Sequence, residues 1–560
     1  MISATSPRNT KGGSAVALAV RAAMVVILLA LLGAQMLYAV YTTSATDDEP
    51  YYIVSGLTAL RTGDYRFNID HPPLMSMILG AAAHLAGAAP LPRNEDWQRG
   101  LRLKYSYFYL WQGPNAPKAV SLVTAARLPV IALSLFLALM VFLWARQLYG
   151  WSAALLALAL YCFEPNLIAH SSVATLDLGI TAAFVLASYS CWRYLRTRRL
   201  LYLLLTGIAL GAAAAIKLPG LLLLIVLPVL MYAIRRDNCQ PTARSVAGPL
   251  AGVVGLALVF LWGVYRFSIA PIALDPGSVR MPLGQYWQAI SFQLDHQQSG
   301  HVAYLLGMVS DRGWWYYYPL AFLVKTSLPL LLLLGLAFSR GKLDGDELSL
   351  IVPAAIFFAF TMFQKLDLGI RYLLPIYPLL IVFVGRILRK PWPVQWGAWP
   401  RRAILVLLAW CVVEAVSCAP HYLSYFNQLA GGPSHGGGVL ADSNLDWGQD
   451  LPALAAWQRA HPTATPLHFA YFGPADVSRY GVECERLPDL GPKDPPQPPE
   501  WYARESQPRA GWIAISANCL KLLSAYHWLQ AYQPVDRAGY SILIYHLPAP
   551  GEGSEEQPRR

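Results

Sequence analysis

The sequence predicts a polytopic α-helical membrane protein that ends in a soluble α/β domain. Of its 560 residues, 56% are hydrophobic and only 13% are charged, and the mean hydropathy of +0.39 is too apolar for an ordinary soluble protein. Apolar runs long enough to span a bilayer, or nearly so, recur from the N-terminus to about residue 420. Beyond that point the composition changes to that of a soluble domain.

We expect about eleven transmembrane segments. The count accepts apolar runs of roughly 15 to 25 residues, and shorter ones where a charged residue marks an end. The basic N-terminus is typical of a signal peptide, but the apolar stretch that follows is longer than the apolar core of a signal peptide. We therefore expect an uncleaved first helix. The expected segments are residues 22–40, 128–145, 151–163 with its continuation, 178–192, 200–216, 218–234, 245–265, 314–338, 348–364, 372–385 and 403–418.

The basic residues predict the orientation, because Lys and Arg collect on the cytoplasmic side. With eleven segments, the short basic connections between them fall on the side assigned to the cytoplasm. They lie at Arg146 and at residues 193–199, 235–236, 340–342 and 386–402. The N-terminus is then cytoplasmic and the tail extracytoplasmic. The same topology accounts for much of the net charge of +11, so no nucleic-acid partner is expected.

Three regions follow from this topology. Residues 1–420 form the membrane region, residues 421–548 an extracytoplasmic α/β domain, and residues 549–560 a disordered tail. Two large loops, residues 41–127 and 266–313, lie on the same side as the domain. Both loops carry acids, histidines and aromatics, which suggests a shared site.

In the soluble domain, three strand-like stretches predict a sheet. They are residues 467–472, 511–516 and 541–546. The run DSNLDWGQD at residues 442–450 precedes a helical pattern. It either caps that helix or forms a binding surface, and the sequence leaves both open. Cys484 and Cys519 lie in this domain, and whether they pair also stays open.

Three adjacent carboxylates, Asp47, Asp48 and Glu49, begin the first loop where a membrane helix meets water. Carboxylates side by side repel one another, so we expect one of them to have a raised proton affinity and to be available as a base. The alternative is that they cap the helix that follows, since Asp and Glu favour helix N-termini.

Ionisable residues within apolar segments are costly and are candidates for function. Lys217, Lys325, Arg371 and Glu414 qualify. At extracytoplasmic helix ends, cations can hold a phosphate at the bilayer surface, Arg in a bidentate way and Lys as a point charge. The alternative is snorkelling toward lipid headgroups.

Aromatic and histidine residues lie on the same face. The run at residues 314–318 is either an interfacial belt or a platform for a sugar ring or isoprenoid chain. No pair among the histidines has helical i,i+4 spacing and the seven cysteines are scattered, so we assign no metal site. A divalent ion stays open but is not indicated, and no other cofactor is expected.

Taken in order, several segments resemble the GT-C glycosyltransferases, most closely bacterial relatives of the protein O-mannosyltransferases and of the lipid A aminoarabinose transferase. The resemblance covers residues 15–460. The segments that carry it are the Asp-Glu pair after the first helix, TGDYRFNIDHPPL, SSVATLDLG, AAAIKLPGLLLL, GWWYYYPLAFLVKTSLPLLLL, LGIRYLLPIYPLL, HYLSYFNQLAGGP and DSNLDWGQDL.

This resemblance implies a bacterial inner-membrane enzyme that moves a sugar from a polyprenyl-phosphate donor to a protein, lipid or glycan acceptor on the extracytoplasmic face, with inversion. It implies catalysis by Asp48, with Glu49 beside it. Donor phosphate ligands would be Arg371, Lys325 and Lys217. The expected donor or acceptor contacts are His71, Asp177, Trp315, Tyr318 and Tyr372.

Two other classes of protein have similar features. A polyprenyl-lipid transporter or flippase would also have many helices and a few buried ions, but transporters tend to show internal repeats, and this sequence shows none. A sensor or assembly protein would need fewer helices as an anchor. An enzyme is therefore expected, with a flippase as the alternative.

Overall fold

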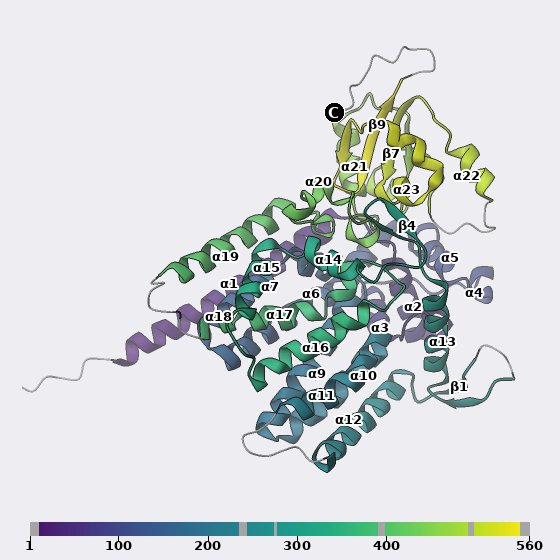
Figure 1. Cartoon of the computed structure of the whole chain (residues 1–560). Helices are drawn as coiled ribbons and strands as arrows, with labels where there is room; N and C mark the ends of the chain where they lie inside the picture. Colours follow the sequence, from purple (N-terminus) through teal and green to yellow (C-terminus); the bar gives the residue numbers. More distant parts are fainter. Residues whose placement is uncertain are drawn as a thin grey trace, which may run out of the picture.

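The computed structural model describes residues 10–234, 243–273, 277–389, 392, 398–490 and 498–548. Helices make up most of the chain up to about residue 420, and a small sheet with short helices follows. Figure 1 shows the sheet at the end of the molecule opposite α11 and α12. The expected tail at 549–560 and the basic pair at 235–236 lie outside the described residues.

The eleven expected membrane segments fall mainly on helices. These are α1 (Thr10–Thr42), α6 (Ala119–Tyr149), α7 (Trp151–Cys162) with α8 (Pro165–Ser171), α9 (Asp177–Thr197), α10 (Leu200–Ile216), η4 (Leu218–Leu222) with α11 (Leu223–Ala233), α12 (Ala243–Val264), α14 (Tyr317–Lys325) with α15 (Leu328–Phe338), α16 (Gly345–Thr361), η5 (Ile370–Leu373) with α17 (Ile376–Val384), and α19 (Trp399–Cys418). A short α18 (Arg386–Arg389) follows α17.

By length and composition, three helices in the described part of the chain can cross a membrane, or five if each of two bent pairs is one span. The bent pairs are α7 with α8, at 62°, and α14 with α15, at 110°. The chain is a multi-pass membrane protein, and the count of eleven spans stays a prediction.

The expected segment at residues 314–338 is not one straight helix, because the chain bends by 110° between α14 and α15. Side chains from distant segments satisfy the polar groups at the break. Asn427 donates to the carbonyl of Thr326 at 2.7 Å, and Ser327 donates to Glu164 at 2.7 Å. Irregular backbone at membrane depth is tolerated where protein groups satisfy it in this way.

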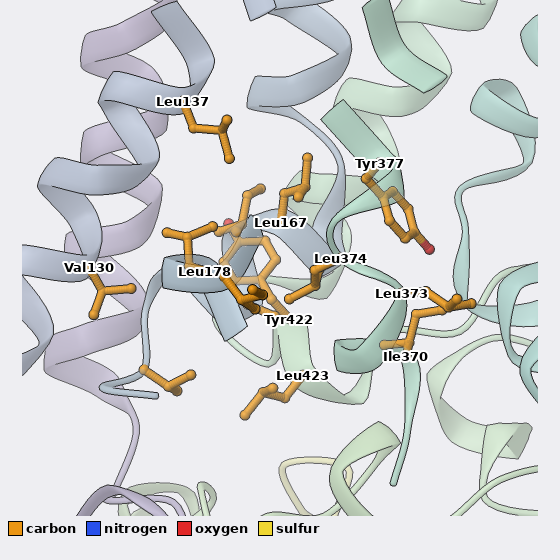
Figure 2. Close-up of a cluster of buried hydrophobic side chains, with 14 of the residues drawn as sticks. Val130, Leu137, Leu167, Leu178, Ile370, Leu373, Leu374, Tyr377, Tyr422 and Leu423 are labelled. Carbon is orange, nitrogen blue, oxygen red and sulfur yellow. The ribbon is translucent and has the colours of Figure 1, made fainter. Parts of the chain in front are cut away.

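A buried apolar cluster joins the membrane helices to the segment that leads into the C-terminal region. Figure 2 shows side chains of α6, α8, α9, η5 and α17 converging with Tyr422 and Leu423 of η7 (Tyr422–Ser424). Both η7 residues are more than 90% buried. This packing fixes η5, which carries Arg371, against the start of the C-terminal region.

The first loop folds into short helices: α2 (Glu49–Thr62), η1 (Arg66–Asn68), α3 (Leu74–Leu85), α4 (Glu95–Arg99), α5 (Arg102–Tyr107), η2 (Phe108–Gln112) and η3 (Ala116–Lys118). Helices α2 and α3 touch at two glycines. A Cβ atom on Gly56 would lie 1.7 Å from the Ser76 carbonyl oxygen, and one on Gly80 would lie 2.3 Å from the Leu57 nitrogen. This close approach fixes the helix that follows Asp48.

The second loop contains two hairpins and a helix: β1 (Ile269–Pro271) with β2 (Arg280–Pro282), α13 (Gly284–Ser299), and β3 (Ala303–Leu305) with β4 (Met308–Ser310). Gln293 of α13 donates to the carbonyl of Asp70 at 2.6 Å, so the two loops are in contact.

The C-terminal region holds a five-stranded sheet in the order β6-β5-β7-β9-β8. Strand β5 (Leu467–Ala470) is parallel to β6 (Glu485–Arg486) and β7 (Gly511–Ser516), and β9 (Ile542–Leu547) is antiparallel to β7 and β8 (Asp536–Ala538). The other elements there are η8 (Gln428–Ala430), α20 (Pro433–Gly436), η9 (Asp442–Asn444), α21 (Leu451–Ala460), η10 (Val477–Tyr480), α22 (Pro499–Glu505), α23 (Ala517–Leu522) and η11 (Ser524–Ala531). The three predicted strands are β5, β7 and β9. Both edge strands were missed, because they are too short to show an alternating pattern.

Candidate active site

A cavity of about 820 Å³ lies where the two loops, the ends of the membrane helices and the C-terminal region meet. Its volume is within the usual range for a small-molecule site. Five carboxylates and three cations line it: Asp47, Asp48, Asp70, Asp295, Asp442, Arg102, Lys217 and Arg371. His71 and Tyr372 also line it. The cavity can therefore hold a ligand with both anionic and hydroxyl groups.

Asp48 occupies the cap position of α2, but its side chain makes no capping hydrogen bond. Its carboxylate instead meets Arg371, with Oδ2 2.7 Å from Nη1. Asp48 is 27% exposed and Arg371 only 9% exposed at the side chain. The side chain of Asp48 therefore does not act as a helix cap, and it lines the cavity instead.

Asp47 also lines the cavity. Burial raises the pKa of its carboxyl to about 7, and the neighbouring charges of Asp48 and Asp442 add to the rise, while Arg371 opposes it. Its backbone nitrogen donates to the carbonyl of Trp447 at 2.9 Å. The acid pair therefore includes a carboxyl that can exchange a proton near neutral pH.

This raised pKa has a measurable consequence for stability. Because the folded-state pKa of Asp47 lies above its ordinary 3.8, the folded protein binds the proton more tightly, and this stabilisation is lost as the pH rises from about 4 through about 7. We expect the melting temperature of the Asp47→Asn variant to fall less over this range than that of the wild type. Parallel curves of melting temperature against pH for the two proteins would contradict the raised pKa of Asp47.

Glu49 does not face the cavity, contrary to the expectation that it acts beside Asp48. Its two oxygens lie 2.7 Å from Nε and Nη2 of Arg127, and both side chains are at most 1% exposed. The backbone nitrogens of Thr46 and Ala174 donate to the same carboxylate. The carboxylate is fully occupied by these partners, so Glu49 holds the loop in place instead of meeting a substrate.

Arg371 belongs to η5, which the apolar cluster of Figure 2 supports. Its guanidinium stacks on the ring of Trp447 at 4.3 Å, and Nε donates to the carbonyl of Leu368 at 3.1 Å. Such stacking pre-orients a guanidinium, and a planar guanidinium suits bidentate phosphate binding.

Lys217 reaches the same cavity from the link between α10 and η4. Its ammonium group lies 2.7 Å from Oδ1 of Asp177 and 3.9 Å from the centre of the Tyr372 ring. Asp177 itself is buried and does not line the cavity. Its role in the structure is to hold Lys217.

Three expected site residues lie elsewhere. Lys325 is fully buried and donates to the carbonyls of Leu423 and Asn444, at 2.9 and 2.6 Å, which fastens the C-terminal region to α14. Tyr318 is buried and donates to the carbonyl of Leu366. Trp315 is 67% exposed. None of the three lines the cavity, so the expected contacts to donor or acceptor are corrected for them.

The sequence did not single out several residues that line the cavity. Asn518 comes from α23, and no motif marked it. Asp442 and Trp447 belong to the DSNLDWGQD run, for which a binding surface was one of two interpretations. Asp70 and Arg102 form an ion pair at 2.8 Å. Among the described residues, no group of three or more His, Cys, Asp or Glu residues could hold a metal ion.

Comparison with known proteins gives one family match. Residues 64–259 match the model of the dolichyl-phosphate-mannose-protein mannosyltransferase family. No curated protein sequence matches the chain.

Three solved structures resemble the chain at low identity. ArnT from Cupriavidus metallidurans bound to undecaprenyl phosphate has 15% identity and a TM-score of 0.48, and the alignment covers 93% of this chain and 97% of ArnT. The Pmt1-Pmt2 complex of S. cerevisiae bound to the sugar donor has 18% identity, a TM-score of 0.33, and coverages of 44% and 33%. AglB from Archaeoglobus fulgidus, in complex with an inhibitory peptide and a dolichol-phosphate, has 11% identity, a TM-score of 0.41, and coverages of 93% and 74%. At these scores, none of the three bears on the chemistry of this chain.

The family match contains the SSVATLDLG and AAAIKLPGLLLL segments and all but the first two residues of TGDYRFNIDHPPL. The cavity residues that lie within it are Asp70, His71, Arg102, Leu103 and Lys217. Over these residues the chain resembles the dolichyl-phosphate-mannose-protein mannosyltransferases, in agreement with the resemblance predicted from the sequence.

Proposed function

We propose that the enzyme transfers a sugar from a polyprenyl-phosphate donor to a protein, lipid or glycan acceptor at the extracytoplasmic face of the bacterial inner membrane. One observation carries this proposal: the acids Asp47 and Asp48 share a cavity with the cations Arg371 and Lys217. Transfer from a phosphate ester needs both a base for the acceptor and positive charge for the leaving phosphate.

In the proposed reaction, Asp48 accepts the proton of an acceptor hydroxyl. The oxygen of that hydroxyl attacks the anomeric carbon of the donor. The bond from that carbon to the phosphate oxygen breaks, and the phosphate leaves with the electron pair. Attack from the face opposite the phosphate inverts the configuration. Arg371 and Lys217 bind the phosphate and stabilise the charge that develops on it.

The ion pair between Asp48 and Arg371 links donor binding to catalysis. The two groups pair their opposite charges at 2.7 Å. A donor phosphate on Arg371 competes with Asp48 for the guanidinium, so the carboxylate becomes available to the acceptor once the donor is bound. His71 and Tyr372 line the same cavity and remain the proposed contacts to donor or acceptor.

The test uses the full-length protein in sealed vesicles with a labelled polyprenyl-phosphate sugar. Passage of the label to an acceptor supports the enzyme. Movement of the unaltered lipid between leaflets, without transfer, would contradict it and support the flippase. Mass analysis of glycoconjugates in a deletion strain then identifies sugar and acceptor together.

Arg371→Ala tests the phosphate role. A hydrogen bond to a charged group contributes about 1.5–3 kcal/mol, so we expect the KM for the donor to rise by about 10- to 100-fold, with little change in the KM for the acceptor. The exposed Arg99, which pairs with Glu95, provides a matched control as Arg99→Ala. A change mainly in the acceptor KM would remove Arg371 from the phosphate site.

A further inference from the structure

We propose that Asp442, from the C-terminal region, binds a hydroxyl group of the sugar that the donor carries. This rests on the proposed function and goes beyond it, because it names a residue that distinguishes the sugar-linked donor from the bare lipid phosphate. It also gives the DSNLDWGQD run, which begins at Asp442, a role inside the active site.

Asp442 lines the same cavity as Asp48 and Arg371. One of its carboxylate oxygens, Oδ1, accepts a hydrogen bond from the backbone nitrogen of Ser443 at 2.7 Å. The other, Oδ2, is buried and has no hydrogen-bond partner among the residues that the structure describes. A buried acceptor without a partner is costly, and a ligand that donates a hydrogen bond removes that cost.

The backbone at Asp442 is held in an uncommon conformation. Its φ angle of +56° is unusual for a residue other than glycine. Asn518 fixes it by accepting a hydrogen bond from the Asp442 nitrogen at 2.8 Å. Strained positions of this kind persist only where the surroundings over-determine them, and they concentrate at functional sites.

The neighbours of Asp442 are bonded to the segment that carries Arg371. Ser443 donates to the carbonyl of Leu368 at 2.6 Å, and Asn444 accepts from the backbone nitrogen of Ile370 at 2.9 Å. Asp442 is therefore held next to the proposed phosphate ligand. Because the sugar is bonded directly to the phosphate, its ring lies within reach of groups beside Arg371.

The chemistry of a carboxylate selects the part of the donor that it can bind. Its negative charge repels the phosphate, and an isoprenoid chain offers no hydrogen-bond donor. The sugar hydroxyls are the hydrogen-bond donors of a polyprenyl-phosphate monosaccharide, and a carboxylate accepts strongly from them. Asp442 thus matches the sugar and no other part of the donor.

The experiment compares the binding of two kinds of lipid to the full-length protein in nanodiscs: bare polyprenyl phosphate, and a panel of polyprenyl-phosphate hexoses and pentoses. The variants are Asp442→Asn and Asp442→Gly. Both asparagine and glycine adopt positive φ readily, so the backbone conformation is kept. The exposed Glu483 of the same region provides the control Glu483→Gln.

We expect the wild type to bind at least one sugar-linked lipid more tightly than the bare phosphate, and both Asp442 variants to lose about 10-fold of that affinity or more. Affinity for the bare phosphate should not fall, because both variants remove a negative charge that repels it. Wild-type affinity for every lipid in both variants would overturn the assignment, as would an equal loss for the bare phosphate or an effect on the acceptor KM alone. A wild type that binds none of the lipids would overturn the proposed function itself.

Discussion

Replacing Asp48 by asparagine is expected to lower the transfer rate by about 100- to 10,000-fold, the usual contribution of a positioned general base. The amide has nearly the same shape but cannot accept the proton of the acceptor hydroxyl. Folding and membrane insertion should survive, because the Asp48 side chain makes no capping hydrogen bond and remains 27% exposed. The measurement is the single-turnover transfer rate, together with the melting temperature of the same preparation.

The control is Asp64→Asn, which changes an acid of the same loop whose partner is the exposed Arg66. It should transfer at the wild-type rate. Full activity in Asp48→Asn would reject Asp48 as the base. If Asp47→Asn alone were inactive, the base would be Asp47, whose carboxyl also lines the cavity.

The helical membrane fold was predictable because apolar runs recur along the sequence, while the number of spans stays a prediction. The break between α14 and α15 was not, since residues 314–338 form one nearly continuous apolar run. Its polar groups are satisfied by Glu164 and Asn427, which are distant in sequence. Hydropathy reports how apolar a segment is and contains no information on such partners.

The site was predictable to a similar degree. Asp48, Arg371 and Lys217 were all expected at one site, and they line one cavity. Lys325 had the same features in sequence, a cation within an apolar segment, yet it binds backbone carbonyls. A carbonyl acceptor belongs to every residue type, so no sequence pattern distinguishes this lysine from a phosphate ligand.

Glu49 was misassigned for a related reason. Its partner Arg127 is 78 residues away, in helix α6, and adjacent acids in a sequence do not report which way each side chain points. Helix α2 begins at Glu49, so Asp48 and Glu49 follow one another through the turn into the helix and face different surroundings.

The buried pair of Glu49 and Arg127 gives the largest expected effect on stability. Removing one partner of a buried ion pair leaves an uncompensated charge and costs about 3–5 kcal/mol. We therefore expect both Glu49→Gln and Arg127→Met to lower the unfolding temperature strongly. Cys162, Cys191, Cys411 and Cys418 are all free and buried, so the reaction of a thiol-specific dye during heating reports unfolding.

The double variant distinguishes the ion pair from the packing of the two side chains. With both charges removed, no unpaired charge remains, so the combined loss should be smaller than the sum of the two single losses. Strict additivity would show that the pair is not coupled.

Glu49→Gln should also lower the transfer rate per folded molecule less than Asp48→Asn does, because the Glu49 carboxylate contacts Arg127 and backbone nitrogens and does not line the cavity. A stable but inactive Glu49→Gln would instead give Glu49 a chemical role. With the expected result, two adjacent carboxylates have separate roles: Glu49 contributes to stability through Arg127, and Asp48 to catalysis.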